Sequence, residues 1–380
     1  MSVAARFLNI SRPILQNSPT RICRAARSRP FSTRSPHFPC VEAHATRESK
    51  LRESSRASSP SSNQSESGPE PTYARPNPAS YNVYHHPLPL PMTYSEPLPS
   101  FDIAYETWGT LSSNRDNVIL LHTGLSASSH AASTSANPSD GWWQKFIGPG
   151  KALDTNQFYI ICTNVLGGCY GSTGPSSTDP TTGCPYATTF PIISIFDMVR
   201  AQWCLLDHLN INKLYASVGC SMGAMSSLAT AWLHPDRVGK IVSISGTARS
   251  TPSSVAMRFA QRSAMDLFDM TLPALQELKL APSTSSPSDT DLPFDSPHSF
   301  HKTSHSKSHP PPLNPPPHLL DLAKGLQPLA HIPTLVLGVQ SDILFTVEQQ
   351  REVADALRMA GNDSVSYYEL GGVWGHDTFL

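Results

Sequence analysis

The sequence is poor in charge. Only 15% of its 380 residues are charged, and 28 basic side chains nearly balance 29 acidic ones, which leaves a net charge of −1. The globular part has no dense run of basic side chains, so the electrostatic footprint of a nucleic-acid-binding protein is missing. No apolar run reaches the roughly 18 residues that a membrane-spanning helix needs. We therefore expect neither a nucleic acid nor a membrane as a partner.

Cysteines are few and lack the spacing of a disulfide framework or a zinc site. The chain has seven, an odd number, spread widely along the sequence. This distribution excludes a secreted disulfide scaffold and fits a reducing compartment. The glycines of Gly148–Ala152 and Gly167–Gly174 match neither the phosphate-binding loop nor the dinucleotide fingerprint. We therefore expect no bound metal and no cofactor.

Prolines are scarce outside two stretches. Residues 1–100 hold 15 of the 36 prolines and residues 282–318 hold ten. We expect residues 42–99 to form a disordered linker and lead-in, and 100–380 to form one domain interrupted by a disordered low-complexity insertion at 282–318. That insertion contains five histidines, which without a fold to fix their geometry predict a solvated loop rather than a metal site.

The first 41 residues contain seven arginines, no lysine and no acidic residue, since the first acid is Glu42. Serines and short apolar patches lie between the arginines. This composition is typical of a mitochondrial transit peptide, and the alternative is a generic basic tail. We expect residues 1–41 to direct the protein to the mitochondrial matrix.

Apolar runs rich in β-forming residues alternate with helical patterns. Ser194 and Asp197 form a capping-box pattern before one helix, and further helices are expected over Met222–Leu233 and Val347–Met359. Such alternation predicts an α/β fold with a mostly parallel central sheet and helices on both faces. The expected strands are Phe101–Thr107, Val118–His122, Phe158–Cys162, Leu214–Val218, Ile241–Ile244, Leu335–Val339 and Val365–Leu370.

The sequence Gly219-Cys220-Ser221-Met222-Gly223 joins one of these strands directly to a helix. A sharp turn of this kind strains the serine backbone and requires small residues on both sides. Ser221 would then project above the sheet at a helix N-terminus, where the amide of Met222 can stabilise an oxyanion. We interpret Ser221 as a nucleophile.

A nucleophilic serine needs a histidine base and an orienting carboxylate. Asp342 follows an expected strand and His376 lies after the last one, so the chain order matches that of the α/β-hydrolase fold. The alternatives are a strand-end cap for Asp342 and a surface loop histidine for His376. Asp377 is the second choice for the acid. A second oxyanion donor is expected from the amide of Gly124 or Leu125, although Gly124 could merely end its strand.

Several longer motifs resemble the homoserine O-acetyltransferase family of α/β-hydrolase-fold acyltransferases. The resemblance covers residues 100–265 and 320–380, and Ala224 stands where the family usually has a glycine. The sequence from His122 to His130 is similar to the fungal mitochondrial serine O-acetyltransferases within that family. The carrying stretches are Gly141–Trp143, Phe146–Thr155, Asn164–Pro175, Asp197–Gln202, Gly219–Gly223 and Gly375–Asp377.

The resemblance implies an acyl transfer in two displacements. Ser221 would take the acetyl group from acetyl-CoA, and the hydroxyl of L-serine would remove it, a reaction of cysteine biosynthesis. The resemblance also implies that Arg262 pairs with the carboxylate of the amino acid and Asp377 with its amine; alternatively, Arg262 is a surface arginine. Homoserine, as in methionine biosynthesis, is the alternative acceptor.

The same resemblance indicates that most of the helical lid is missing. Ser263-Ala264 leads directly into a segment that follows the lid in family members, and the chain ends four residues after His376. A shortened lid implies loss of acetyl groups to water and leaves a homodimer in doubt, because the lid commonly forms the dimer contact. A lid-less serine esterase and an inactive pseudo-enzyme are the other readings.

Overall fold

The computed structural model describes residues 79–252, 254–260, 263, 314–371 and 375–380. They all belong to the second of two compact units, which spans Pro71–Leu380. The expected transit peptide, the first part of the linker, Arg262 and most of residues 262–313 lie outside the described residues. Within the described residues, no helix combines the length and the apolar character needed to cross a membrane.

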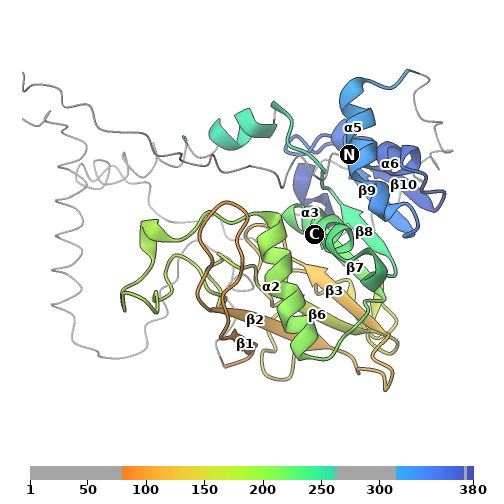
Figure 1. Ribbon diagram of the computed structural model, residues 1–380. Coiled ribbons are helices and arrows are strands. Elements are labelled where there is room, and N and C mark those ends of the chain that lie inside the picture. The colour runs from red at the N-terminus through yellow and green to blue at the C-terminus, as the bar shows by residue number, and fades with distance from the viewer. Residues whose placement is uncertain (1–78, 253, 261–262, 264–313, 372–374) are drawn as a thin grey trace, which may run out of the picture. The chain divides into compact units, whose positions relative to one another are not determined.

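The body of this unit is an eight-stranded sheet (Figure 1). Strands β6, β3, β7, β8, β9 and β10 are neighbours in this order and run parallel to one another. Strand β2 pairs in antiparallel fashion with both β1 and β6. The expected, mostly parallel sheet is thus confirmed. In order across the sheet, the strands are β1 (Asn82–His86), β2 (Phe101–Trp108), β6 (Tyr159–Thr163), β3 (Val118–His122), β7 (Ala216–Cys220), β8 (Ile241–Ile244), β9 (Thr334–Val339) and β10 (Val365–Leu370).

The expected strands and helices lie within two residues of the observed ones. Helix α2 begins after a capping box in which Ser194 and Asp197 bond each other's backbone, as the sequence pattern predicted. The α-helices that the structure describes along their whole length are α2 (Ile195–His208), α3 (Met222–Leu233), α5 (Pro317–Gly325) and α6 (Val347–Met359). Shorter elements are β4 (Ile147–Gly148), β5 (Leu153–Asp154), η3 (Ala187–Thr189), η4 (Pro235–Arg237), η5 (Gln327–Leu329) and η6 (Gly375–Phe379).

Helices were expected on both faces of the sheet, and the four helices described along their whole length cover one face. Helices α2, α3, α5 and α6 all contribute apolar side chains to one cluster, against one set of alternating strand residues such as Val118 and Leu120. The opposite strand residues, such as Ile119 and Leu121, pack against Trp142 and Trp143 from the segment between β3 and β6. Continuous burial of β3 and β7 follows from cover on both sides. Burial of a strand on both sides does not reveal whether a helix or a loop packs against it.

The boundaries of the two proline-rich stretches also need correction. Residues 82–86, expected within a disordered lead-in, form β1 and pair with β2 from Asn82–Tyr105 to His86–Phe101. The buried side chains of Leu90 and Leu98 continue this ordered segment. At the other stretch, helix α5 begins at Pro317, because proline at the first turn needs no amide partner. Proline content is therefore a poor guide both to where the domain begins and to where the insertion ends.

The buried ring of His122 predicts that the fold weakens in acid. Burial lowers the pKa of His122 to about 3, and Gln202 only partly opposes this, whereas the pKa in an unfolded chain is about 6.5. Between these pH values the unfolded chain binds a proton that the folded chain does not. The free energy of unfolding should therefore fall with acidification below about pH 6.5, by up to about 1.4 kcal/mol per pH unit from this group.

Chemical denaturation of wild type and His122→Gln between pH 7.5 and 4.5 measures this contribution as the difference between the two slopes. The exposed His331 provides the matched control. We expect His122→Gln to have the shallower pH dependence and His331→Gln to keep the wild-type slope. Equal slopes for His122→Gln and wild type would contradict the assignment.

Candidate active site

Ser221 lies at the sharp turn between β7 and α3. Its backbone has φ 60° and ψ −124°, a left-handed conformation that costs free energy for any residue with a side chain. A Cβ atom on Gly219 would lie 2.0 Å from the carbonyl oxygen of Gly223, and one on Gly223 would lie 2.3 Å from that of His122. The strained turn and its need for two glycines, both predicted from the sequence, are confirmed.

The structure brings Ser221, His376 and Asp342 together. His376 Nδ1 lies 2.7 Å from Asp342 Oδ2, and His376 Nε2 lies 2.7 Å from Ser221 Oγ. Because a carboxylate only accepts hydrogen bonds, Nδ1 carries the proton and Nε2 is free to accept from the serine hydroxyl. The C-terminal end of the chain accordingly lies close to α3 and β7 in Figure 1. This is the arrangement of a serine with its general base.

Asp342 is held in place by groups that the sequence analysis did not identify. The backbone amides of Leu344 and Phe345 donate to its Oδ1 at 2.8 and 2.9 Å. The Gln350 side chain donates to Oδ2 at 3.3 Å and also bonds the Phe345 carbonyl oxygen. A turn-forming aspartate after a strand was a usable signal for the two amides. No spacing rule marks Gln350, which reads as an ordinary polar position of helix α6.

The His376 turn is fixed by contacts on both sides. Gly375 N donates to Ser341 Oγ at 3.1 Å, and the indole of Trp143 donates to the Phe379 carbonyl oxygen at 3.1 Å. The His376 and Phe379 rings meet edge to face, 5.4 Å apart. These contacts hold the imidazole between Asp342 and Ser221.

The side chains of Asp342, Ser221 and His376 differ in how much of their surface is exposed. The Asp342 side chain is fully buried, whereas the His376 side chain is 17% exposed and Ser221 is 8% exposed. Asp377, the second choice for the acid, is exposed, and Asp342 occupies the position against the imidazole. Arg262 lies outside the described residues. A buried carboxylate with a more open histidine leaves one edge of the site accessible to a substrate.

The loop that carries two of the expected oxyanion donors, Gly124 and Leu125, lies beside Ser221. A Cβ on Gly124 would lie 3.7 Å from Ser221 Cβ, so this loop passes directly beside the serine. Burial raises the pKa of the Cys220 thiol to about 12, although a backbone hydrogen bond from Gly124 acts in the opposite direction. The amide of Leu125 donates to no described residue. The oxyanion roles of Leu125 and Met222 stay predictions, and the contact with Cys220 counts against Gly124.

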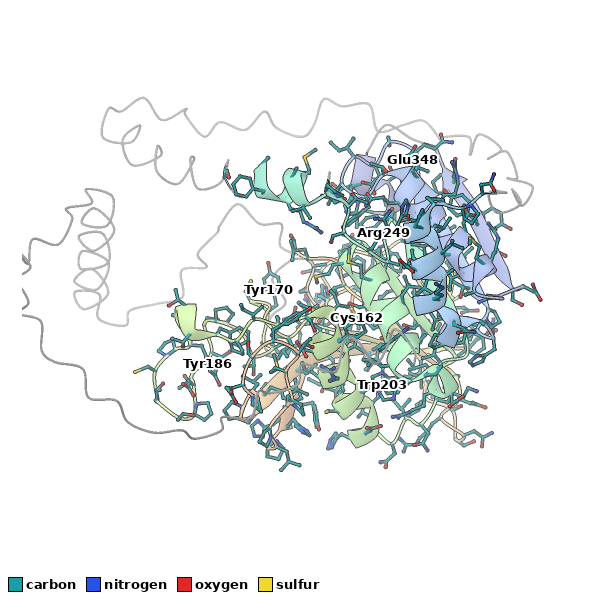
Figure 2. All side chains as sticks on the ribbon, turned by 45° about the horizontal axis from the view of Figure 1, so that its top comes forward. Cys162, Tyr170, Tyr186, Trp203, Arg249 and Glu348 are labelled. Atoms are coloured by element: carbon teal, nitrogen blue, oxygen red, sulfur yellow. The ribbon has the colours of Figure 1, made fainter. Side chains whose placement is uncertain are left out.

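Burial disfavours the thiolate form of the two thiols near the site. Burial raises the pKa of Cys220 to about 12 and that of Cys162 well above its usual value. Cys162 lies within the body of the sheet in Figure 2. Among the described residues, no group of three or more histidine, cysteine, aspartate or glutamate side chains could hold a metal ion. The group beside a general base in this part of the chain is the Ser221 hydroxyl, 2.7 Å from His376 Nε2.

Several known proteins are similar in sequence to this chain. The chain is 40% identical to a serine O-succinyltransferase of Emericella nidulans over 450 residues, covering 90% of this chain and 84% of the relative. It is 39% identical to the enzyme of the same name from Schizosaccharomyces pombe, covering 83% of each. Both relatives are named for transfer to serine, the acceptor expected from the sequence, but of a succinyl group where the sequence-based expectation was acetyl.

Solved structures agree on the fold. Esterase E22 matches with a TM-score of 0.59 and 25% identity, covering 78% of this chain and 94% of its own. Homoserine O-acetyltransferase from Bacillus anthracis matches with a TM-score of 0.59 and 23% identity, covering 78% and 92%. A family model described as alpha/beta hydrolase fold matches residues 117–376. The chain therefore belongs to the alpha/beta hydrolase family, together with the serine O-succinyltransferases that it resembles.

Proposed function

We propose that this protein transfers an acyl group from a coenzyme A thioester to the hydroxyl of L-serine through an acyl-Ser221 intermediate. The observation that carries the proposal is the pair of 2.7 Å contacts that join Ser221 to His376 and His376 to Asp342. The serine acceptor is supported by the names of relatives 39 and 40% identical to this chain.

The reaction consists of two balanced displacements. In the first displacement, His376 takes the proton of the Ser221 hydroxyl, and the Ser221 oxygen attacks the thioester carbonyl. The carbon–sulfur bond then breaks, and the thiol of coenzyme A leaves with that proton. In the second, His376 takes the proton of the acceptor hydroxyl, whose oxygen attacks the acyl-Ser221 ester. Ser221 regains its proton and O-acyl-L-serine leaves. Amides of Leu125 and Met222 would stabilise the oxyanion in both steps.

The acyl group is the point at which the expectation from sequence resemblance and the named relatives differ. The resemblance implied acetyl, whereas both fungal relatives are named for succinyl transfer. We therefore propose succinyl as the acyl group. Acetyl-CoA and succinyl-CoA offered in competition, with L-serine or L-homoserine, separate these alternatives.

The roles of Asp377 and Arg262 in binding the amino acid belong to the same proposal. Asp377 is an exposed carboxylate that follows His376 directly, a position from which it can meet the amine of a bound amino acid. Arg262 would pair with the amino-acid carboxylate, since a guanidinium binds a carboxylate through two parallel hydrogen bonds. Asp377→Asn should therefore raise KM for L-serine more than it lowers kcat.

A reduced cover over the site remains part of the proposal. The alignment with the Emericella relative spans 450 residues and is longer than this 380-residue chain, so the relative contains segments without a counterpart here. Beside the site, the side chains of Leu125 and Ile343 are 78% and 72% exposed. An open site admits water to the acyl-enzyme. We propose that hydrolysis competes with transfer.

The test is a product balance in purified protein. With succinyl-CoA and L-serine, we expect coenzyme A release to equal the sum of O-succinylserine and free succinate, and Ser221→Ala to abolish all three products. Ester hydrolysis indifferent to L-serine would support an esterase instead. No coenzyme A release and no labelling of Ser221 by a fluorophosphonate would overturn the proposal.

A further inference from the structure

Two buried side chains of opposite charge lie beside the loop that follows β3. Glu106 on β2 is 1% exposed, and His130 is fully buried. His130 Nδ1 lies 2.9 Å from Glu106 Oε2, and Ser129 Oγ donates to Glu106 Oε1 at 3.3 Å. The triad chemistry uses none of these groups. A buried carboxylate is costly unless it is paired, so its presence here requires an explanation.

The contacts of His130 and the raised pKa of its ring fit an ion pair. His130 Nε2 lies 3.0 Å from the carbonyl oxygen of Ser139, which can only accept. With Glu106 ionised, its carboxylate also only accepts, so both ring nitrogens of His130 donate and the ring is an imidazolium. Burial lowers the pKa of His130, but the hydrogen bonds to Glu106 and Ser139 outweigh it and hold the pKa above its usual value. The loop that follows β3 is thus anchored by a buried charged pair, Glu106 and His130.

This anchor fixes the loop that carries the amide of Leu125. At one end, the loop leaves β3 at His122 and passes beside Ser221 at Gly124. At the other end, Ser129 and His130 are bound to Glu106. Only a few residues lie between the two fixed ends. The position of the Leu125 amide therefore depends on where Glu106 holds the far end.

The same loop is tied to the His376 turn through two tryptophans. The indole of Trp142 donates to the Ser128 carbonyl oxygen at 3.0 Å, and its amide donates to that of His130 at 3.3 Å. The next residue, Trp143, donates its indole proton to Phe379 in the His376 turn. Displacement of the loop would thus disturb the oxyanion donor first and the base second.

We propose that the Glu106–His130 ion pair is a positioning device that holds the Leu125 amide against the oxyanion of the acyl group on Ser221. The inference rests on the proposed function, because it concerns the same tetrahedral intermediate. Loss of one oxyanion donor costs about 100- to 1,000-fold in kcat, and misplacement of a donor should cost about 10- to 100-fold. Glu106 and His130 do not themselves touch the substrate.

The test measures acylation of Ser221 by p-nitrophenyl acetate, which needs neither coenzyme A nor L-serine. The size of the nitrophenolate burst counts folded sites, and its rate reports the positioning of each site. Glu106→Gln keeps the shape of the side chain and removes its charge. We expect a burst of wild-type size, a rate about 10- to 100-fold lower, and a similar loss of affinity for phenylboronic acid, whose tetrahedral adduct uses the same donors.

Asp102→Asn is the matched control, because it breaks another His–carboxylate contact on β2, an exposed one to His85 at 2.7 Å. It should leave both burst size and rate unchanged. If Glu106→Gln yields no folded sites, Ser129→Ala decides, since it removes a single contact to Glu106. An unchanged rate and boronate affinity in the folded variant would overturn the inference. Absence of any burst in wild type would instead count against the proposed function.

Discussion

His376→Ala is expected to lower kcat for acyl transfer by about 10⁴-fold while leaving the fold intact. The imidazole is the base within 2.7 Å of Ser221 Oγ, and without it the hydroxyl keeps its proton at neutral pH. The His376 side chain is 17% exposed, so water can enter the space that its removal leaves. Steady-state rates with succinyl-CoA and L-serine, together with thermal unfolding, measure the two effects separately.

The double variant provides the sharper test of a cooperating unit. Residues that act in one chemical step lose their effects together, so Ser221→Ala/His376→Ala should be no slower than either single variant. Asp342→Asn should also lose activity, because an amide that donates toward Nδ1 would favour the wrong tautomer. His331→Ala, at an exposed histidine, is the control and should retain full activity. Additive losses, or less than tenfold loss in His376→Ala, would contradict the assignment.

The parts of the site that follow a strand could be predicted from the sequence. Ser221 and Asp342 each come directly after a buried parallel strand, and parallel strands bring their carboxyl ends to one edge of the sheet. A predicted strand order was not needed for that argument. His376 was harder, because it depends on a short turn after the last strand, and there the chain order of the family supplied the link.

Contacts between loops could not be predicted in this way. Glu106 occupies a strand position where a charged residue reads as solvent-facing, yet it is buried because His130, 24 residues away, reaches it. Gln350 likewise binds Asp342 from helix α6. The bounds of that helix were predicted correctly, but the side chains that it turns toward Asp342 were not. Spacing along one element reveals which residues share a face. It does not reveal which distant polar group completes a buried hydrogen bond.

Proline-rich composition was the least reliable predictor of where ordered structure begins. Proline-rich sequence predicted disorder up to residue 99, yet β1 pairs along its whole length with β2. Prolines before and after a strand restrict the chain without preventing pairing, particularly at the edge of a sheet. The same composition at residue 317 begins a helix, since proline is favoured in the first turn.

Gly219→Ala is expected to be the most damaging small substitution for the fold. A Cβ at this position would lie 2.0 Å from the carbonyl oxygen of Gly223, which is backbone of helix α3 and cannot rotate away. Relief requires moving β7 and α3 apart at the turn that holds Ser221. We expect a loss of about 3 kcal/mol in the free energy of unfolding, measured by urea denaturation, and loss of the Ser221 reaction with fluorophosphonate even where the variant is folded.

Gly325→Ala is the matched control, because the added Cβ at the end of α5 would meet no atom within 4 Å and needs no left-handed backbone. A methyl group there should leave stability unchanged or raise it slightly, since alanine favours a helix more than glycine does. Equal unfolding midpoints for Gly219→Ala and Gly325→Ala would show that the turn can relax. The close approach of strand and helix would then not be what holds the serine in its strained conformation.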